Sequence, residues 1–276
     1  MVRAMNARVL APIAICLLAA GADPAAAAEG AWTDGIKASV RLIAAGTAPD
    51  GRLSAGIEIV MPPGWHTYWR TPGDAGIAPT FDFSASVNVA DVAVAFPVPT
   101  RLDDGFSVTN VYVDRVVLPL AVTVADPAKP VDLSVTLELG VCAEICVPDS
   151  VTAVVSVPTG ENDSAAAEIL GAASALVPSP AEPGAFAVES AAWDGGTDKR
   201  PVYRFAATVP DAASADIFVE GPDDWSAYLP VRDGGGDVVW TVKFSRLGAT
   251  VPIEGATFRV TLVSGGRAIE QTIVAE

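Results

Sequence analysis

The chain has 276 residues, of which 33 are acidic and 17 are basic, so its net charge is −16. An acidic chain of this kind argues against nucleic acids and anionic membrane surfaces as partners, because both carry negative charge themselves. Cysteine is scarce. Of the three cysteines, only Cys142 and Cys146 lie close together.

The first 28 residues have the features of a secretory signal. Arg3 and Arg8 precede an apolar segment over residues 9–20, and three alanines at 26–28 form a small-residue cleavage site. We therefore expect residues 1–28 to be removed as a signal peptide, together with Cys16. No later stretch approaches the ~18 apolar residues of a membrane span, so we expect an exported, periplasmic protein.

Short apolar and β-branched runs follow, separated by glycine, proline and aspartate. This spacing predicts an all-β fold of the sandwich type. The runs before residue 160 lie at residues 56–61, 91–96, 116–124, 131–139 and 151–157.

One segment interrupts the β pattern. Residues 161–176 are alanine-rich and begin with Asn162, Asp163 and Ser164, which predicts a helix, and a proline-rich linker follows over 177–184. Five further β runs lie at residues 202–209, 216–220, 238–244, 257–263 and 268–274, with a glycine-rich turn over 233–236. We expect one sandwich over 29–160, a helix and linker over 161–184, and a second, smaller sandwich over 185–276.

The cysteine pair is predicted to straddle a tight connection between two antiparallel strands. Cross-strand neighbours lie about 4.5–5.5 Å apart at Cα, which a disulfide can bridge. As a structural clip, so short a loop contributes only about 2 kcal/mol, against about 4.7 kcal/mol for a 100-residue loop. Glu144 and Asp149 are acidic neighbours, which raise a thiol pKa. The chemistry of these residues alone does not decide whether the pair is a structural clip or a redox site.

Three segments then resemble a known family. Residues 140–148, which contain the cysteine pair, are similar to the cysteine motif of the amino-terminal periplasmic domain of the disulfide reductase DsbD and the related copper-tolerance protein ScsB. Residues 64–76 and 112–119 resemble two further segments of this group, in the same order. The second β domain resembles, more loosely, the longer ScsB-type amino-terminal regions.

The resemblance implies an immunoglobulin-like sandwich that exchanges electrons through its cysteines without a cofactor. Cys146 would form mixed disulfides with thioredoxin-like periplasmic proteins, and Cys142 would resolve them. Electrons would come from a separate membrane-embedded donor of the DsbD type, because this chain has no membrane domain. A cap loop containing Asp103, Asp104 and Phe106 would shield the pair, with Phe106 as its lid.

Other functions of these residues stay open. His66, the sole histidine, could join Cys142 and Cys146 as a soft ligand set for copper. A non-redox interaction module is a third hypothesis, in which cysteine-to-serine changes leave function intact.

The aromatic residues near His66 have two interpretations. Trp65, Tyr68 and Trp69 could line the site, although clustered aromatic residues in β proteins usually belong to the core. Nearby, Arg70 is predicted to pair with Asp74 around a turn at residues 72–73.

Overall fold

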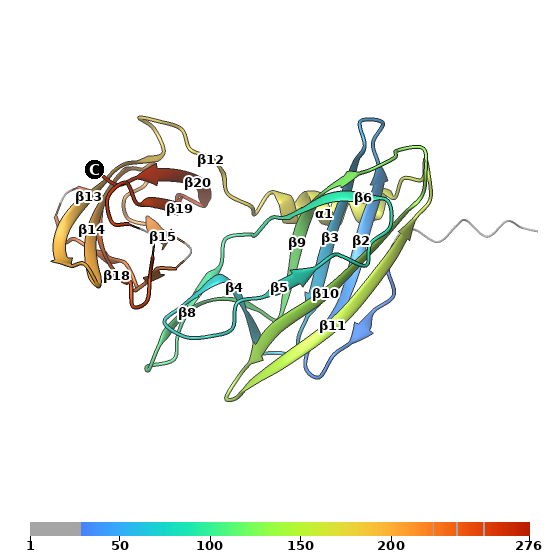
Figure 1. Cartoon of the computed structure of the whole chain (residues 1–276), viewed down its shortest axis with the longest axis horizontal. Coiled ribbons are helices and arrows are strands. Elements are labelled where there is room, and N and C mark those ends of the chain that lie inside the picture. Colours follow the sequence, from blue (N-terminus) through green and yellow to red (C-terminus); the bar gives the residue numbers. More distant parts are fainter. Residues whose placement is uncertain (1–28, 223, 236, 251) are drawn as a thin grey trace, which may run out of the picture.

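The computed structural model describes residues 29–222, 224–235, 237–250 and 252–276. The predicted signal peptide at residues 1–28 lies outside the described residues. Within the described part of the chain, no helix has the length and apolar character needed to cross a membrane. These described residues are almost entirely β, with two sandwiches lying beside each other and one helix before the second sandwich (Figure 1). The predicted fold class is confirmed.

The first sandwich is immunoglobulin-like and consists of two facing antiparallel sheets. One sheet has the order β1 (Thr33–Asp34), β2 (Ser39–Thr47), β3 (Arg52–Val60), β9 (Arg115–Val124) and β6 (Val89–Val94). The other has the order β11 (Cys146–Val157), β10 (Val131–Cys142), β4 (His66–Gly73), β8 (Val108–Val113) and β7 (Thr100–Asp103), and β5 (Thr80–Asp82) also pairs with β10. The central strand β4 therefore lies between β10 and β8.

The core of this sandwich follows from the alternation of side chains along each strand. Leu42 of β2, Ile57 of β3 and Leu137 of β10 are fully buried between the sheets. In β11, every second residue from Asp149 to Val157 is buried and the intervening ones are exposed. Each buried aliphatic side chain contributes about 1.5–3 kcal/mol, so this layer fixes the strand register on which the cysteine pair depends.

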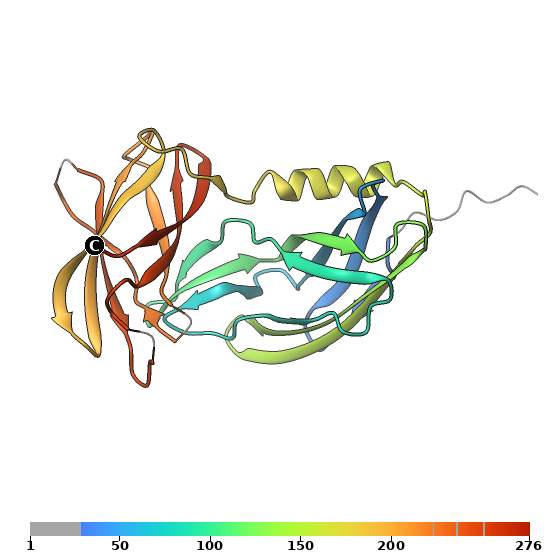
Figure 2. The same cartoon turned by 45° about the horizontal axis from the view of Figure 1, so that its top comes forward.

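The helix α1 (Ser164–Ser174) covers the outer face of the first sheet (Figure 2). It begins at Asp163, whose carboxylate accepts the backbone N–H groups of Ala165 and Ala166 at 2.9 and 3.1 Å. Leu170 packs on this sheet at Gly56, where a Cβ atom would lie only 2.5 Å from the leucine. The helix predicted over 161–176 is confirmed, with both ends slightly shorter.

The second sandwich has two smaller sheets. One has the order β12 (Ser179–Pro180), β20 (Arg267–Val274), β19 (Thr257–Ser264) and β15 (Asp216–Glu220). The other has the order β13 (Ala187–Thr197), β14 (Arg200–Thr208), β18 (Val239–Ser245) and β16 (Ser226–Ala227), and β17 (Val231–Arg232) also pairs with β18. Its core is aromatic: the ring of Phe258 lies 4.8 Å from that of Tyr203 and 5.1 Å from that of Phe244. The predicted linker is partly ordered as β12, which pairs in parallel with β20.

The predicted ion pair between Arg70 and Asp74 is wrong. The turn expected at residues 72–73 is absent because β4 continues to Gly73. Arg70 instead reaches the second sandwich, where it pairs with Glu220 at 2.6 Å and with Glu270. Asp74 accepts the backbone N–H of Val108.

Candidate functional site

The cysteine pair lies at the end of the β10–β11 hairpin. Cys142 and Cys146 are direct cross-strand partners, their Cα atoms are 4.1 Å apart, and a disulfide joins them. The intervening turn is closed by a 3.0 Å hydrogen bond in which the N–H of Ala143 donates to the carbonyl of Ile145. The prediction that the pair straddles a connection between antiparallel strands is confirmed.

The two sulfur-bearing residues differ in exposure. Cys142 is only 1% exposed, because β10 lies between β11 and β4 and its cysteine packs against Tyr68, Val111 and Leu102. Cys146 begins the edge strand β11 and is exposed. An incoming thiolate can therefore reach the Cys146 side of the disulfide more readily than the Cys142 side.

Tyr68 of β4 lies directly under the disulfide. Its hydroxyl is 3.1 Å from Cys142 Sγ, to which it donates, and 3.4 Å from Cys146 Sγ. Burial raises the pKa of the Tyr68 hydroxyl, and the charge of Asp104 adds to this, so the hydroxyl keeps its proton at neutral pH. Two glycines make room for the ring: a Cβ atom would lie 2.3 Å from it at Gly76 and 3.3 Å from it at Gly140.

His66 occupies the end of the same strand. It pairs across the sheet with Cys142 of β10 on one side and with Val113 of β8 on the other. Its ring meets the ring of Tyr68 edge-on, with centroids 5.6 Å apart. Burial lowers the pKa of His66, while the charge of Asp104 works in the opposite direction. The imidazole is therefore neutral at pH 7 and supplies no positive charge to the sulfurs.

The two tryptophans near His66, for which site lining and core packing were both open, have other surroundings. Trp69 is 1% exposed and belongs to the core, where its ring meets Phe218 at 5.6 Å. Trp65 lies beneath the ammonium group of Lys37, which is 4.8 Å from the ring centroid. Because side chains alternate along β4, Tyr68 contacts the disulfide and Trp69 takes the opposite face.

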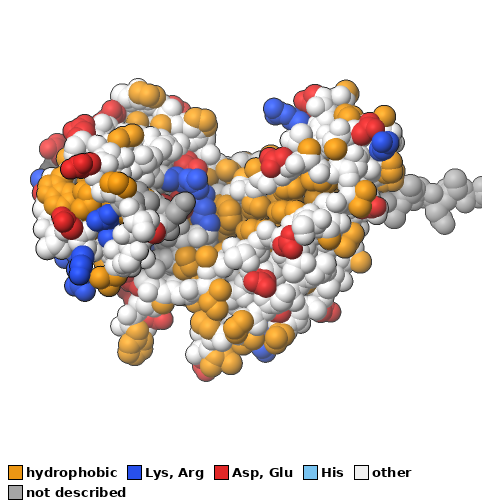
Figure 3. Space-filling view, viewed as in Figure 1, with side chains coloured by type: hydrophobic (Ala, Val, Ile, Leu, Met, Phe, Trp, Pro, Cys, Tyr) orange, Lys and Arg blue, Asp and Glu red, His pale blue; other side chains and the backbone are white. Residues whose placement is uncertain are grey.

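The predicted cap loop is the turn between β7 and β8. Asp103 accepts the N–H of Gly105, and Asp104 accepts the N–H groups of Phe106 and Ser107, each at 2.8 Å. The bonds to Phe106 and Ser107 lower the pKa of Asp104. The Phe106 side chain is 101% exposed, so it does not cover the disulfide in this structure. Apolar side chains mark the ends of both hairpins, and a notch separates them (Figure 3).

The three segments that resemble the family are neighbours in space. Residues 140–148 lie on β10 and β11, residues 64–76 on and around β4, and residues 112–119 on β8 and β9. Thr67 Oγ1 donates to the carbonyl of Gly140, and the N–H of Gly64 donates to the carboxylate of Asp114. These bonds tie the segments together around the cysteine pair.

Two residues that pack on Cys142 were not predicted from the sequence. Val111 of β8 is fully buried in the cluster that contains Cys142, and Leu102 of β7 is partly buried and packs against this cluster. Little in the sequence indicated their role, because Val111 lies just outside the third motif and Leu102 lies just outside the cap loop. Only the pairing of β8 with β4 and with β7 shows that they share the face of Tyr68.

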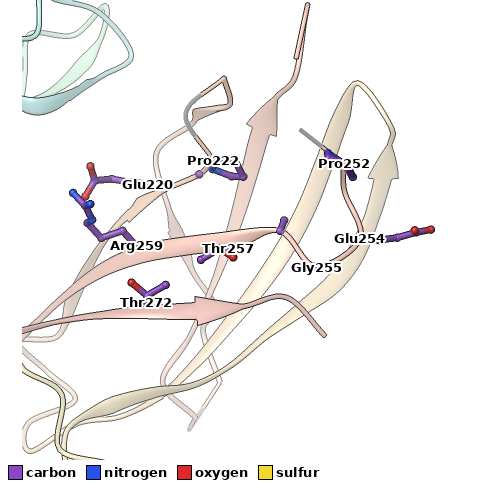
Figure 4. A pocket seen from close by; sticks show the side chains of 10 residues that line it. Glu220, Pro222, Pro252, Glu254, Gly255, Thr257, Arg259 and Thr272 are labelled. Carbon is purple, nitrogen blue, oxygen red and sulfur yellow. The ribbon is translucent and has the colours of Figure 1, made fainter. Parts of the chain in front are cut away.

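Two other features of the described chain bear on alternative sites. No group of three or more His, Cys, Asp or Glu residues is arranged to hold a metal ion within the described ranges. With both cysteines joined in the disulfide, Cys142, Cys146 and His66 do not fit a copper ion in this form of the protein. A pocket of about 470 Å³ lies on the second sandwich between β15, β19 and β20, and its lining includes Glu220, Arg259 and Thr272 (Figure 4). It contains none of the predicted site residues.

Comparisons with known proteins agree with this geometry. The family described as "Thiol:disulfide interchange protein DsbD, N-terminal" matches residues 39–158. The chain is also similar in structure to the amino-terminal periplasmic domain of ScsB from Proteus mirabilis, with a TM-score of 0.71 and 21% sequence identity over 90% of this chain and 98% of that one. A comparison with curated proteins finds no match. The family model thus covers most of the first sandwich, and the resemblance stated from the motifs is confirmed.

The state of His66 gives a direct test of the site's electrostatics. We expect its pKa to lie below the ordinary value of 6.5, because burial disfavours the charged imidazole. Asp104→Asn should lower this pKa further, because it removes the charge that favours protonation. An NMR titration of the sole histidine measures both values, with Asp103→Asn as the control. A pKa at or above 6.5, or a rise in Asp104→Asn, contradicts this description.

Proposed function

We propose that the chain is a periplasmic thiol–disulfide exchange protein, in which Cys146 forms the mixed disulfide with a partner and Cys142 resolves it. One observation carries the proposal: the disulfide ends a hairpin with Cys146 exposed and Cys142 buried. A disulfide that only clips the hairpin contributes about 2 kcal/mol for a loop this short, and it gains nothing from this asymmetry.

The reaction begins from the reduced pair. The Cys146 thiolate attacks one sulfur of the partner's disulfide, which forms a mixed disulfide and releases the partner's other sulfur as a thiolate that takes up a proton. Cys142 then loses its proton and attacks Cys146 Sγ, which frees the partner's remaining sulfur. The partner has gained two electrons and two protons, and the pair has become the disulfide seen here. A dithiol donor restores the reduced pair by the reverse steps.

The surface around the pair suits a protein partner. Ile145, Val113 and Phe106 are 64%, 42% and 101% exposed, and they lie at the ends of the β10–β11 hairpin, of β8 and of the β7–β8 hairpin. Exposed apolar side chains beside a reactive pair, such as Ile145 in its turn and Val113 in the row of His66 and Cys142, are typical of interaction sites. We propose thioredoxin-like proteins as the acceptors and a membrane-embedded protein of the DsbD type as the donor. The match of residues 39–158 to a family described as a thiol:disulfide interchange protein supports this assignment.

The proposed compartment rests on three observations. The sequence of residues 1–28 has the features of a secretory signal, a disulfide persists in oxidising compartments, and the similar ScsB domain is described as periplasmic.

Trapping separates the roles of the two cysteines. Cys142→Ser should accumulate a mixed disulfide with its partner, because Cys146 can attack but no resolving thiol remains. Cys146→Ser should trap at least about tenfold less, because the remaining thiol is buried. Both variants are expressed in the periplasm, and the adducts are separated on non-reducing gels and identified by mass spectrometry.

Three results contradict this proposal in different ways. If neither variant captures a partner, exchange with proteins is not the function. If Cys146→Ser traps as well as Cys142→Ser, the roles are assigned wrongly. If the reduced protein binds copper in a manner that Cys142→Ser and His66→Ala abolish while no partner is trapped, the copper hypothesis replaces ours.

Tyr68 should govern how readily Cys146 ionises. A hydrogen bond to a charged sulfur is worth about 1.5–3 kcal/mol, and the lower end applies to the long 3.4 Å contact between the Tyr68 hydroxyl and Cys146 Sγ, so losing it in Tyr68→Phe should raise the Cys146 pKa by about one unit. The thiolate fraction then falls about tenfold at pH 7, but the greater nucleophilicity of the more basic thiolate compensates in part, which leaves attack about threefold slower.

The pH dependence of iodoacetamide alkylation, measured in the Cys142→Ser background, gives both values. Tyr228→Phe, a change at an exposed tyrosine of the second sandwich, is the matched control. An unchanged pH profile in Tyr68→Phe contradicts the role of the hydroxyl.

A further inference from the structure

We propose that Arg101 and Asp216 are positioning residues, through which the second sandwich holds the β7–β8 hairpin away from the disulfide and keeps Cys146 uncovered. This inference rests on the proposed exchange function. It assigns a role in the reaction to the second sandwich, although none of that sandwich's residues contains a thiol.

The contact joins the edge strand of the site to the second sandwich. Arg101 lies on β7, two residues before Asp103. Its guanidinium makes a bidentate pair with the Asp216 carboxylate, at 2.8 Å from Nε and 3.2 Å from Nη2, and also donates to the carbonyl of Ile217. The same group lies 4.4 Å from the ring centroid of Phe218. A planar guanidinium that makes two hydrogen bonds to one carboxylate and stacks on an aromatic ring has little conformational freedom. This contact therefore fixes β7 to β15.

Two further contacts hold the neighbouring strands. Arg70 of β4, two residues after Tyr68, is mostly buried between Glu220 and Glu270 of the second sandwich, and Thr71 Oγ1 donates to Glu220 at 2.8 Å. Residues 228–230 of the second sandwich line a narrow crevice together with Val108 of β8. The second sandwich therefore touches β4, β7 and β8, the strands that carry Tyr68 and the cap loop.

The hairpin needs such support because little else restrains it. β7 has 4 residues and lies at the edge of its sheet, paired only with β8. Short hairpins are marginally stable by themselves, and edge strands are the first to open. The hairpin lies beside the site, since Leu102 of β7 packs on the cluster formed by Tyr68, Val111 and Cys142.

The direction of the effect follows from exposure. Phe106 is 101% exposed, and Cys146 is exposed as well. The Phe106 ring already lies away from Cys146, so greater freedom of the hairpin can only lengthen the time that this ring covers the Cys146 sulfur. The phenyl ring gains by leaving water, and the apolar end of the β10–β11 hairpin, across the notch in Figure 3, offers a surface where it can do so. Releasing the hairpin should therefore slow reactions at Cys146.

A double-mutant cycle in the full chain tests this inference. The rate constant for reduction of the disulfide by dithiothreitol should fall about threefold to tenfold in Arg101→Ala, because it is proportional to the fraction of molecules in which Cys146 is uncovered. The rate in Arg101→Ala with Phe106→Ala should return to that of Phe106→Ala alone, because no ring remains to cover the sulfur. Amide hydrogen exchange over residues 103–108 should be at least about tenfold faster in Arg101→Ala.

The controls keep a general loss of structure apart from a loss of positioning. Arg204→Ala removes an ion pair with Asp233 inside the second sandwich. It should change neither the rate of disulfide reduction nor the rate of amide hydrogen exchange over residues 103–108. Asp216→Asn repeats the test from the other side of the contact if Arg101→Ala does not fold. A rate in Arg101→Ala equal to or above wild type, or a slow rate that Phe106→Ala fails to restore, overturns the inference. Because dithiothreitol replaces the natural partner, these rates are independent of whether a partner is trapped, which is the test of the proposed function.

Discussion

The antiparallel register of β10 and β11 is the constraint on which the site depends. It places Cys142 opposite Cys146 at the end of the hairpin, and the position of β10 inside the sheet buries the first while the edge strand β11 exposes the second. A slip of one residue would reverse the two faces of β11 and move its buried valines into water. The core of the first sandwich therefore maintains the difference between the two sulfurs.

The strand β4 connects this hairpin to the rest of the molecule. Its side chains alternate between two faces. Tyr68 contacts both sulfurs on one face, whereas Trp69 enters the core on the other and packs on Phe218 of the second sandwich. Arg70 continues the same strand into an ion network with Glu220 and Glu270, in which the carboxylates outweigh the cost of burial and raise the pKa of the guanidinium. A single strand thus supports the disulfide from below and joins the two sandwiches.

Alternation and turn residues were sufficient to predict the all-β class, the helix capped by Asp163 and the place of the cysteine pair, because these follow from local patterns. The end of strand β4 was harder to predict, since the proline and glycine at residues 72–73 are typical of a turn. The local pattern therefore predicted an ion pair between Arg70 and Asp74. Its true partners, Glu220 and Glu270, are distant in sequence and become neighbours only when the two sandwiches pack together. The exposure of Phe106 could not be predicted either, because it depends on how the hairpin is held and not on its own residues.

The central claim is that the two thiols of the reduced protein differ in access. The most direct measurement is a brief pulse of iodoacetamide on the reduced wild-type chain, followed by peptide mapping of the singly labelled product. The structure predicts that nearly all of the first label falls on Cys146, with Cys142 labelled only after the protein is unfolded. Equal labelling of both thiols, or faster labelling of Cys142, would contradict it.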